Sequence, residues 1–498
     1  MTVAAVLSAA AALIPLGYLA VRSFEHGAGT VWRVLWRDRT VELAARSLAL
    51  AGAVTAACLV LGVLAAWLVV RSDLPARRPV AVLLVLPLAV PSYVSGFTWI
   101  AEWPVLAGFS GAFLVLTLVS FPYVLLPVAA ALRAADPGVE EVARSLGKTS
   151  WQTFLVVTLR QVRPAATAGG LLVALYVLSD FGAVSLMRYE AFTMGIYTSY
   201  RATFDRTPAA ILGCVLVVLA IALTIGERRA RGAAAVRSSR GAPRTAAVVP
   251  LRRARIPAVL GVLGLITVSL GVPVYSLVRW LVIGSSAGID MAGLVSAATG
   301  TVTVSALGAL LTVLMAIPIG ILAARHRGPV VRGVELASFA GHALPGITIG
   351  LALVFFGIRL APALYQTTPM LAFAYAVLFL PLAVGAVRTG VSNAPPVLED
   401  VSRSLGKGRA ATQLLVTLPL AAPSIVAGAA LVFLTCAKEL PATLLLRPTE
   451  VDTLATELWS KTEGAAFAAA APYAAVLLVV AALPALLLDR FLHTRGLP

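Results

Sequence analysis

One segment of this chain occurs twice, and its two copies set the architecture. Residues 137–164 read PGVEEVARSLGKTSWQTFLVVTLRQVRP, and residues 396–423 read PVLEDVSRSLGKGRAATQLLVTLPLAAP. The copies lie 259 residues apart and are identical at 14 of 28 positions. The same register continues without a gap to Asp180/Glu439 and Arg188/Arg447. Self-similarity at one fixed offset indicates an internal duplication.

Composition places the duplicated chain in a membrane. Hydrophobic residues make up 60% of the 498 residues, charged residues make up 12%, and the mean hydropathy is +0.94. A soluble domain carries roughly a quarter charged residues. Apolar runs of about 20 residues cross a bilayer as helices. They predict an all-α polytopic protein with about twelve spans, near 3–21, 45–70, 79–99, 107–132, 165–187, 208–226, 256–283, 300–324, 334–357, 368–387, 421–440 and 467–488. The run 3–21 is interpreted as a retained span rather than a signal peptide.

The predicted spans divide into two sixes. We expect a first transmembrane half at 1–226, a basic linker at 227–255 and a second half at 256–498, arranged as two parallel six-helix repeats. The linker has nine arginines and one acid and is interpreted as solvated chain beside anionic headgroups. The net charge of +17 comes from arginines in short loops between apolar runs. That distribution indicates cytoplasmic termini and excludes nucleic-acid binding as its explanation.

Each repeat copy predicts a short docking helix. Apolar residues at Val139, Val142, Ala143 and Leu146 form one face of two helical turns, and Gly147 follows as a helix-ending glycine. A two-turn helix is unstable alone in water, so it must dock. It can rest on its own membrane domain or insert into a groove on a partner. Two matched copies favour a symmetric pair of partners.

These loops resemble the "EAA" loops of permease subunits in ATP-binding-cassette importers. The copies read Glu141-Val142-Ala143…Gly147 and Asp400-Val401-Ser402…Gly406. The second keeps the family's Leu-Pro pair at Leu418-Pro419, whereas the first has Leu159-Arg160. The resemblance implies that both loops couple to a cytoplasmic ATPase, through Glu140, Glu141, Arg144, Gly147, Glu399, Asp400, Arg403 and Gly406.

A closer resemblance, to fused ferric-iron permeases, covers nearly the whole chain. It rests on 179–186 (SDFGAVSL), on 438–448 (KELPATLLLRP) and on 452–456 (DTLAT). It implies a permease of the type I importer class in a bacterial cytoplasmic membrane. Its partners would be two copies of an ATPase and an extracytoplasmic binding protein that delivers ferric iron. Similar fused permeases carry thiamine, phosphonates or polyamines, which remain alternative substrates.

The motifs that the chain lacks also bear on function. It has no G-x-x-x-x-G-K-[ST] loop, so ATP and Mg²⁺ are expected on the separate ATPase, with no cofactor and no enzymatic activity in this chain. A secondary transporter, the second alternative, would be expected to carry ionisable residues deep in its spans. His342, the one histidine predicted inside a span, is interpreted as a polar residue satisfied between helices. Cys58, Cys214 and Cys436 have no metal-type spacing and are interpreted as packing residues.

Two matched pairs are candidate transport residues. Asp180 and Glu439 occupy equivalent repeat positions near the outer ends of the fifth and eleventh predicted spans. Either they are surface acids at helix ends, paired with a neighbour such as Lys438, or they line a central path. Arg188 and Arg447, eight residues further on, are predicted to contact the acidic surface of a binding protein.

Overall fold

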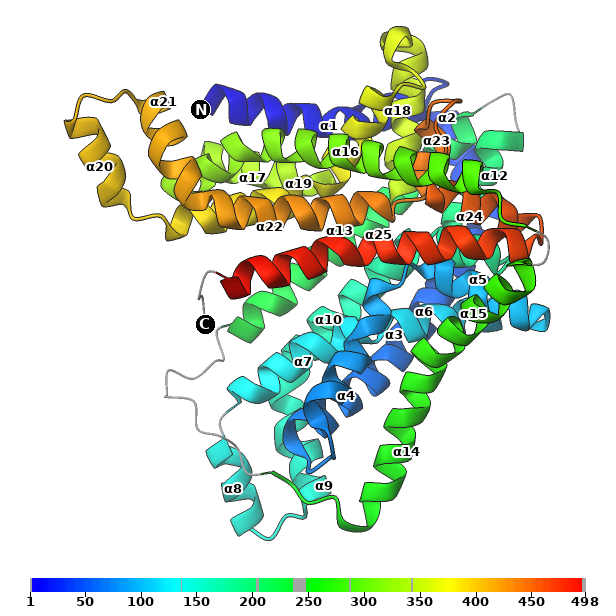
Figure 1. Cartoon of the computed structure of the whole chain (residues 1–498), viewed down its shortest axis with the longest axis vertical. Coiled ribbons are helices and arrows are strands. Elements are labelled where there is room, and N and C mark those ends of the chain that lie inside the picture. The colour runs from blue at the N-terminus through cyan, green and yellow to red at the C-terminus, as the bar shows by residue number, and fades with distance from the viewer. Residues whose placement is uncertain are drawn as a thin grey trace. The chain divides into compact units, whose positions relative to one another are not determined.

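The structure is a computed structural model, and it describes residues 2–135, 137–202, 206–235, 248–285, 288–341 and 344–494. These residues form helices joined by turns, in the order that Figure 1 traces from blue to red. The one isolated β-bridge among them joins Ser72 to Val249. The prediction of an all-α polytopic protein is confirmed. His342 lies outside the described residues, as do residues 236–247 of the linker.

Nine helical segments in the described chain are long and apolar enough to cross a membrane, and a tenth span results if one bent helix pair is counted. The nine are Thr2–Phe24 (α1), Asp38–Arg71 (α3), Phe109–Ala134 (α6 and α7), Trp151–Ser179, Thr207–Gly226, Arg252–Gly284, Met291–Arg325 (α16), Thr368–Asn393 (α19) and Arg409–Ala437. Phe467–Ala481, at the start of α25 (Phe467–Thr494), is a shorter apolar helix. Nine or ten segments of the described chain thus meet the length and composition of a span, compared with the twelve apolar runs identified in the sequence.

The third predicted span of each half is broken. Predicted span 79–99 is the bent pair, in which Arg77–Ala89 and α5 (Ser92–Glu102) meet at 91°. Predicted span 334–357 is split into α17 (Pro329–Ala340) and α18 (Gly346–Leu360). A proline directly precedes the second segment in each half, Pro91 before α5 and Pro345 before α18. Proline has no N–H to donate and disfavours helical geometry in the preceding residue, so it ends one segment and begins the next.

The described chain forms two compact units, and each contains a helix from the other sequence half. Unit 1 comprises 1–36, 196–217 and 287–498, so α1 packs on α16, α17 and α18. Unit 2 comprises 37–195 and 218–286, so α15 (Val272–Ser285) packs on α5. The first helix of each half therefore belongs to the compact unit built by the other half.

Polar contacts fix each exchanged helix. In unit 2 the Ser276 hydroxyl of α15 donates to the Thr98 carbonyl at 3.0 Å and to the Glu102 carboxylate at 3.0 Å, and Arg279 pairs with Glu102. In unit 1 Glu25, just after α1, pairs with Arg359 of α18 at 2.5 Å.

Glycines allow the central helices of each unit to pack closely. A Cβ at Gly62 of α3 would lie 2.6 Å from the Val124 Cβ of α7 (Pro122–Ala134). A Cβ at Gly320 of α16 would lie 2.5 Å from the Val387 Cγ1 of α19. Small residues at crossings of this kind are the usual means of close helix packing in membranes.

The linker differs from prediction at its C-terminal end. A fully solvated linker would make few contacts with the helices, but the Val249 N–H donates to the Arg71 carbonyl at 2.8 Å and the Val249 carbonyl accepts from Asp73 N–H at 3.2 Å. The Leu251 N–H then donates to the Asp73 carboxylate at 2.8 Å. The backbone of 249–251 is thus held at the end of α3.

Candidate coupling loops and transport residues

The duplicated loops form the predicted short helices, α8 (Pro137–Ser145) in unit 2 and α20 (Pro396–Ser404) in unit 1. Each ends in a glycine with left-handed backbone, Gly147 at φ +84° and Gly406 at φ +80°. In the first turn, Gly147 N–H donates to Arg144 O at 2.9 Å and Lys148 N–H to Ala143 O at 3.1 Å. The second turn repeats both bonds at 3.0 and 3.2 Å. This is the Schellman ending, whose left-handed position favours glycine.

Most of the apolar stripe of each loop helix faces outward, although Ala143 of the first helix is buried. Val139, Val142 and Leu146 are exposed on the first helix, and Leu146 retains 76% of its accessible surface. The second helix exposes Leu398, Val401 and Leu405, and Leu405 also retains 76%. Three exposed apolar side chains on two turns form a surface that a partner groove would bury.

The predicted coupling residues divide between the two faces of each helix. Glu140 and Glu399 turn inward, with side chains only 8% and 17% exposed. Glu141 and Asp400 are exposed, and Asp400 pairs with Arg403 at 2.5 Å along the same helix. Arg144 lies 3.9 Å from Glu140. Electrostatic contact with a partner is therefore available mainly to Glu141, Asp400 and the two arginines.

The inward acids meet two residues that the sequence reasoning missed in each half. In unit 1 the Arg325 guanidinium at the end of α16 donates to the Glu399 carboxylate at 3.0 and 2.7 Å, and to the Ala394 carbonyl at 2.9 Å. The Thr417 hydroxyl donates to the same carboxylate at 3.0 Å. The Arg325–Glu399–Thr417 cluster therefore joins three elements.

Unit 2 contains the matching cluster. Arg71, at the end of α3, lies 3.4 Å from the Glu140 carboxylate, and the Thr158 hydroxyl donates to Glu140 at 2.9 Å. Thr158 and Thr417 are the last residues of π-helical segments, Phe154–Thr158 and Gln413–Thr417. The sequence offered a partial signal, because this threonine is identical in both repeat copies.

Asp180 and Glu439 stand at equivalent positions, each just before a short helix. Asp180 is 7% exposed and accepts the Ala183 N–H at 2.9 Å, the Val184 N–H at 3.3 Å and the Ser92 hydroxyl of α5. It follows the span that ends at Ser179 and precedes α11 (Gly182–Leu186).

Glu439 is half-buried and makes the equivalent bonds before α23 (Pro441–Leu446). It accepts the Ala442 N–H at 3.0 Å, the Thr443 N–H at 3.1 Å and the Thr443 hydroxyl at 2.9 Å. Both carboxylates thus cap a helix start, where backbone donors lack helical partners. A role for either acid in translocation stays a prediction.

Arg188 is exposed and has an unusual backbone. Its φ is +52°, in the position after α11 where a glycine is usual. The Arg188 N–H donates to the Ser185 carbonyl at 3.0 Å, and the Tyr189 N–H donates to the Val184 carbonyl at 2.9 Å. Two residues on, Glu190 pairs with Arg39 at 2.8 Å and Arg46 at 3.2 Å. The hydrogen bond from Arg39 holds the pKa of Glu190 below its ordinary value.

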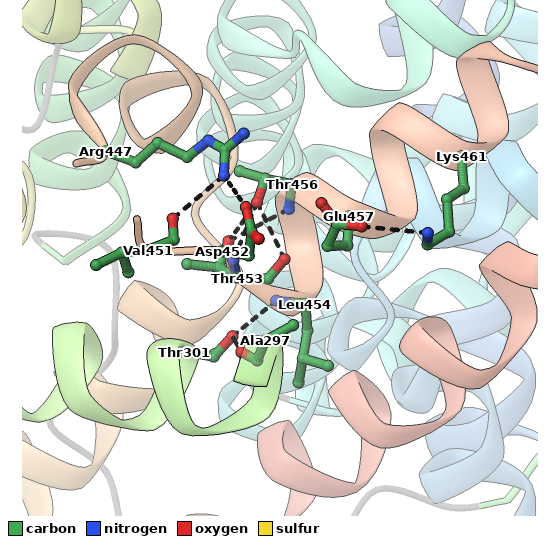
Figure 2. Close-up of polar contacts among 10 residues, drawn as sticks. All are labelled: Ala297, Thr301, Arg447, Val451, Asp452, Thr453, Leu454, Thr456, Glu457 and Lys461. Carbon is green, nitrogen blue, oxygen red and sulfur yellow. Dashed lines mark hydrogen bonds and ion pairs between the residues drawn. The ribbon is translucent and has the colours of Figure 1, made fainter. Parts of the chain in front are cut away.

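Arg447 closes a loop of its own chain. Its guanidinium donates to the Val451 carbonyl at 3.2 Å and pairs with Asp452, as Figure 2 shows. Thr453 then begins α24 (Leu454–Glu463) with a capping box to Thr456. The Leu454 N–H donates to the Thr301 hydroxyl of α16 at 2.8 Å, which fixes the loop on that helix (Figure 2). Arg188 and Arg447 therefore differ in environment despite their matched positions.

No group of three or more His, Cys, Asp or Glu side chains within the described ranges is placed to hold a metal ion. Cys58 and Cys436 are buried and Cys214 is half-buried, all three as free thiols.

The duplicated helices and loops match a known family. The model of the binding-protein-dependent transport system inner membrane component family matches residues 58–229 and 316–493, one segment in each half. The chain belongs to this family of multi-pass membrane transport permeases, whose members work with a substrate-binding protein and an ATPase.

A similar protein extends the match to nearly the whole chain. The Fe(3+)-transport system permease protein FbpB 2 of Haemophilus influenzae is 36% identical over 483 residues, which cover 96% of this chain and 95% of the relative. The sulfate transport system permease protein CysT of Escherichia coli is 28% identical over 234 residues, 42% of this chain and 83% of the relative. The sulfate permease thus resembles a stretch of about one half.

Proposed function

We propose that this chain is the permease subunit of an ATP-driven importer that moves ferric iron inward from an extracytoplasmic binding protein. The observation that carries the ATP-driven part is the pair of loop helices, α8 and α20. Each presents an exposed apolar stripe and ends in a glycine with positive φ. One such helix in each half fits two ATPase copies, one per loop.

Ferric iron as the substrate is supported by the relative that spans nearly the whole chain, whose name gives Fe(3+) transport. Thiamine, phosphonate and polyamine remain alternative cargoes for the same class of transporter. Sulfate is a further candidate because CysT, which matches about half of this chain, is named a sulfate permease. A secondary transporter not coupled to ATP is the alternative of a different class.

Topology and cofactors complete the proposal. We place the chain in the cytoplasmic membrane of a bacterium, with both termini and both loop helices in the cytoplasm. The arginines between the apolar runs support that orientation. ATP and Mg²⁺ belong to the partner ATPase, and this chain holds no cofactor of its own.

A pull-down tests the class. The full chain, co-expressed with its partner ATPase, should retain the ATPase in detergent. Replacing the exposed Leu146 and Leu405 by Glu should release it, because each charge would enter an apolar groove. Equal retention by the double variant would contradict docking through these loops.

A further inference from the structure

The inward acid of each loop helix ties three elements together. Glu399 belongs to α20, Arg325 to the end of the long span α16, and Thr417 to the π-helical segment that leads into α22 (Leu418–Ala437). The Arg325 guanidinium and the Thr417 hydroxyl both donate to the Glu399 carboxylate, at distances of 2.7 to 3.0 Å. The Glu399 side chain therefore links α20 both to α16 and to the helical segment that leads into α22.

This carboxylate is the main polar anchor of a helix too short to be stable by itself. Its apolar stripe faces outward, so the inward side relies on Glu399 and on Ser402, whose hydroxyl lies 3.1 Å from that of Thr412. A shielded ion pair is costly to break, because one charge is left without a partner. The pair should therefore persist while the loop helix moves, and the span should follow the helix.

The π-helical segments offer a place where the register can adjust. They occupy matched positions, Phe154–Thr158 and Gln413–Thr417, and each ends on the threonine that donates to the acid. Single π-turns inside α-helices recur at functional sites. The same assembly appears in both units, although the arginines lie 254 residues apart and the acids and threonines 259.

We propose that Arg71 and Arg325 are positioning residues that transmit movement of the loop helices into the second span of each half. This inference rests on the proposed ATP-driven function, and it specifies which side chains connect the loop helices to the membrane helices. The two assemblies differ in tightness. Arg325 makes three hydrogen bonds of 3.0 Å or less, whereas Arg71 approaches Glu140 only to 3.4 Å. Loss of Arg325 should therefore be the more damaging.

The test uses the full chain with its partner ATPase, reconstituted with a binding protein loaded with ferric iron. We expect Arg325→Gln to retain the ATPase and to keep ATP hydrolysis within about twofold, while iron uptake per ATP falls about tenfold. Arg325→Lys should restore part of the ratio because the charge remains. Arg388→Gln is the matched control, since Arg388 pairs with Glu335 at 2.5 Å in the same unit and joins α19 to α17. It should leave the ratio unchanged.

An unchanged uptake-to-hydrolysis ratio in Arg325→Gln would overturn the proposal, including the case in which both activities fall in parallel. A second readout does not depend on the cargo. In the wild-type complex, nucleotide should change backbone hydrogen exchange in both α20 and the last turn of α16. In Arg325→Gln the change in α16 should disappear. If wild type takes up no iron but shows this coupled exchange, only the proposed cargo fails. If the variant keeps the coupled change in α16, the positioning role fails.

Discussion

Replacing Gly406 by valine should uncouple transport without removing the protein from the membrane. Gly406 ends α20 at φ +80°, and a Cβ there would meet no atom within 4 Å. The free-energy cost of valine at position 406 therefore comes from backbone conformation alone. Left-handed geometry costs an L-residue roughly 1–2 kcal/mol, and a β-branched side chain lies at the upper end. A change of that size lowers the population of the native turn by roughly 5–30-fold.

The same loop supplies the control. Gly408 lies two residues further on, and a Cβ added there would also meet no atom within 4 Å. Its φ of −66° and ψ of 164° are angles that valine adopts readily. Gly408→Val should therefore behave as wild type. Gly147, at φ +84°, allows the test to be repeated in the first half.

The assay compares ATP-dependent uptake with the amount of permease in the membrane. We expect Gly406→Val and Gly147→Val each to reduce uptake at normal permease levels, and the double variant to lose more, since distant sites act additively. Normal uptake in both single variants would refute the interpretation of α8 and α20 as coupling helices.

Three further predictions use other parts of the chain. Co-expressed fragments 1–240 and 241–498 should assemble, because the cut precedes the contact at Val249; failure of the fragments to copurify would contradict the two-half organisation. Asp180→Asn with Glu439→Gln should lower iron uptake while stimulated ATP hydrolysis survives, and unchanged uptake would leave both acids as helix caps only. Arg188→Gly should preserve or raise thermal stability by relieving the φ of +52°, yet weaken docking of the binding protein; equal docking affinity would remove Arg188 from that surface.

The loop helices could be predicted because each is specified by neighbouring residues. The apolar spacing of Val139, Val142 and Leu146 and the glycine after it specify two turns and a Schellman ending. The structure confirms a helix at 137–145 and positive φ at Gly147 and Gly406. The sequence does not show which face of each loop helix packs inward. That face is set by the position of Arg71 at the end of α3 and of Arg325 at the end of α16.

Span boundaries were less predictable. Hydropathy alone placed the fifth and eleventh spans at 165–187 and 421–440, whereas the helices run over Trp151–Ser179 and Arg409–Ala437. The helix continues from the loop through a π-helical segment, which the hydropathy window does not detect. The breaks at Pro91 and Pro345 depend on packing as well as on proline, because Pro318 and Pro381 lie inside continuous helices.

The sequence does not predict that the first helix of each half packs within the unit built by the other half. Hydropathy places α1 and α15 in the membrane but does not say which neighbours they pack against. The contacts of Glu25 with Arg359 and of Ser276 with Thr98 join residues more than 170 positions apart. Only a three-dimensional arrangement reveals such pairs.

Uptake into proteoliposomes is the decisive experiment for ATP-driven import of ferric iron. The vesicles would contain the full chain and its partner ATPase, with ATP on the ATPase side and the binding protein, loaded with radioactive ferric iron, on the other. Parallel vesicles would receive radioactive sulfate or thiamine, or an ion gradient in place of ATP. An ATP-driven ferric-iron importer should accumulate iron only when both ATP and the binding protein are present. Uptake driven by the ion gradient alone, or ATP-dependent uptake of sulfate or thiamine in place of iron, would contradict it.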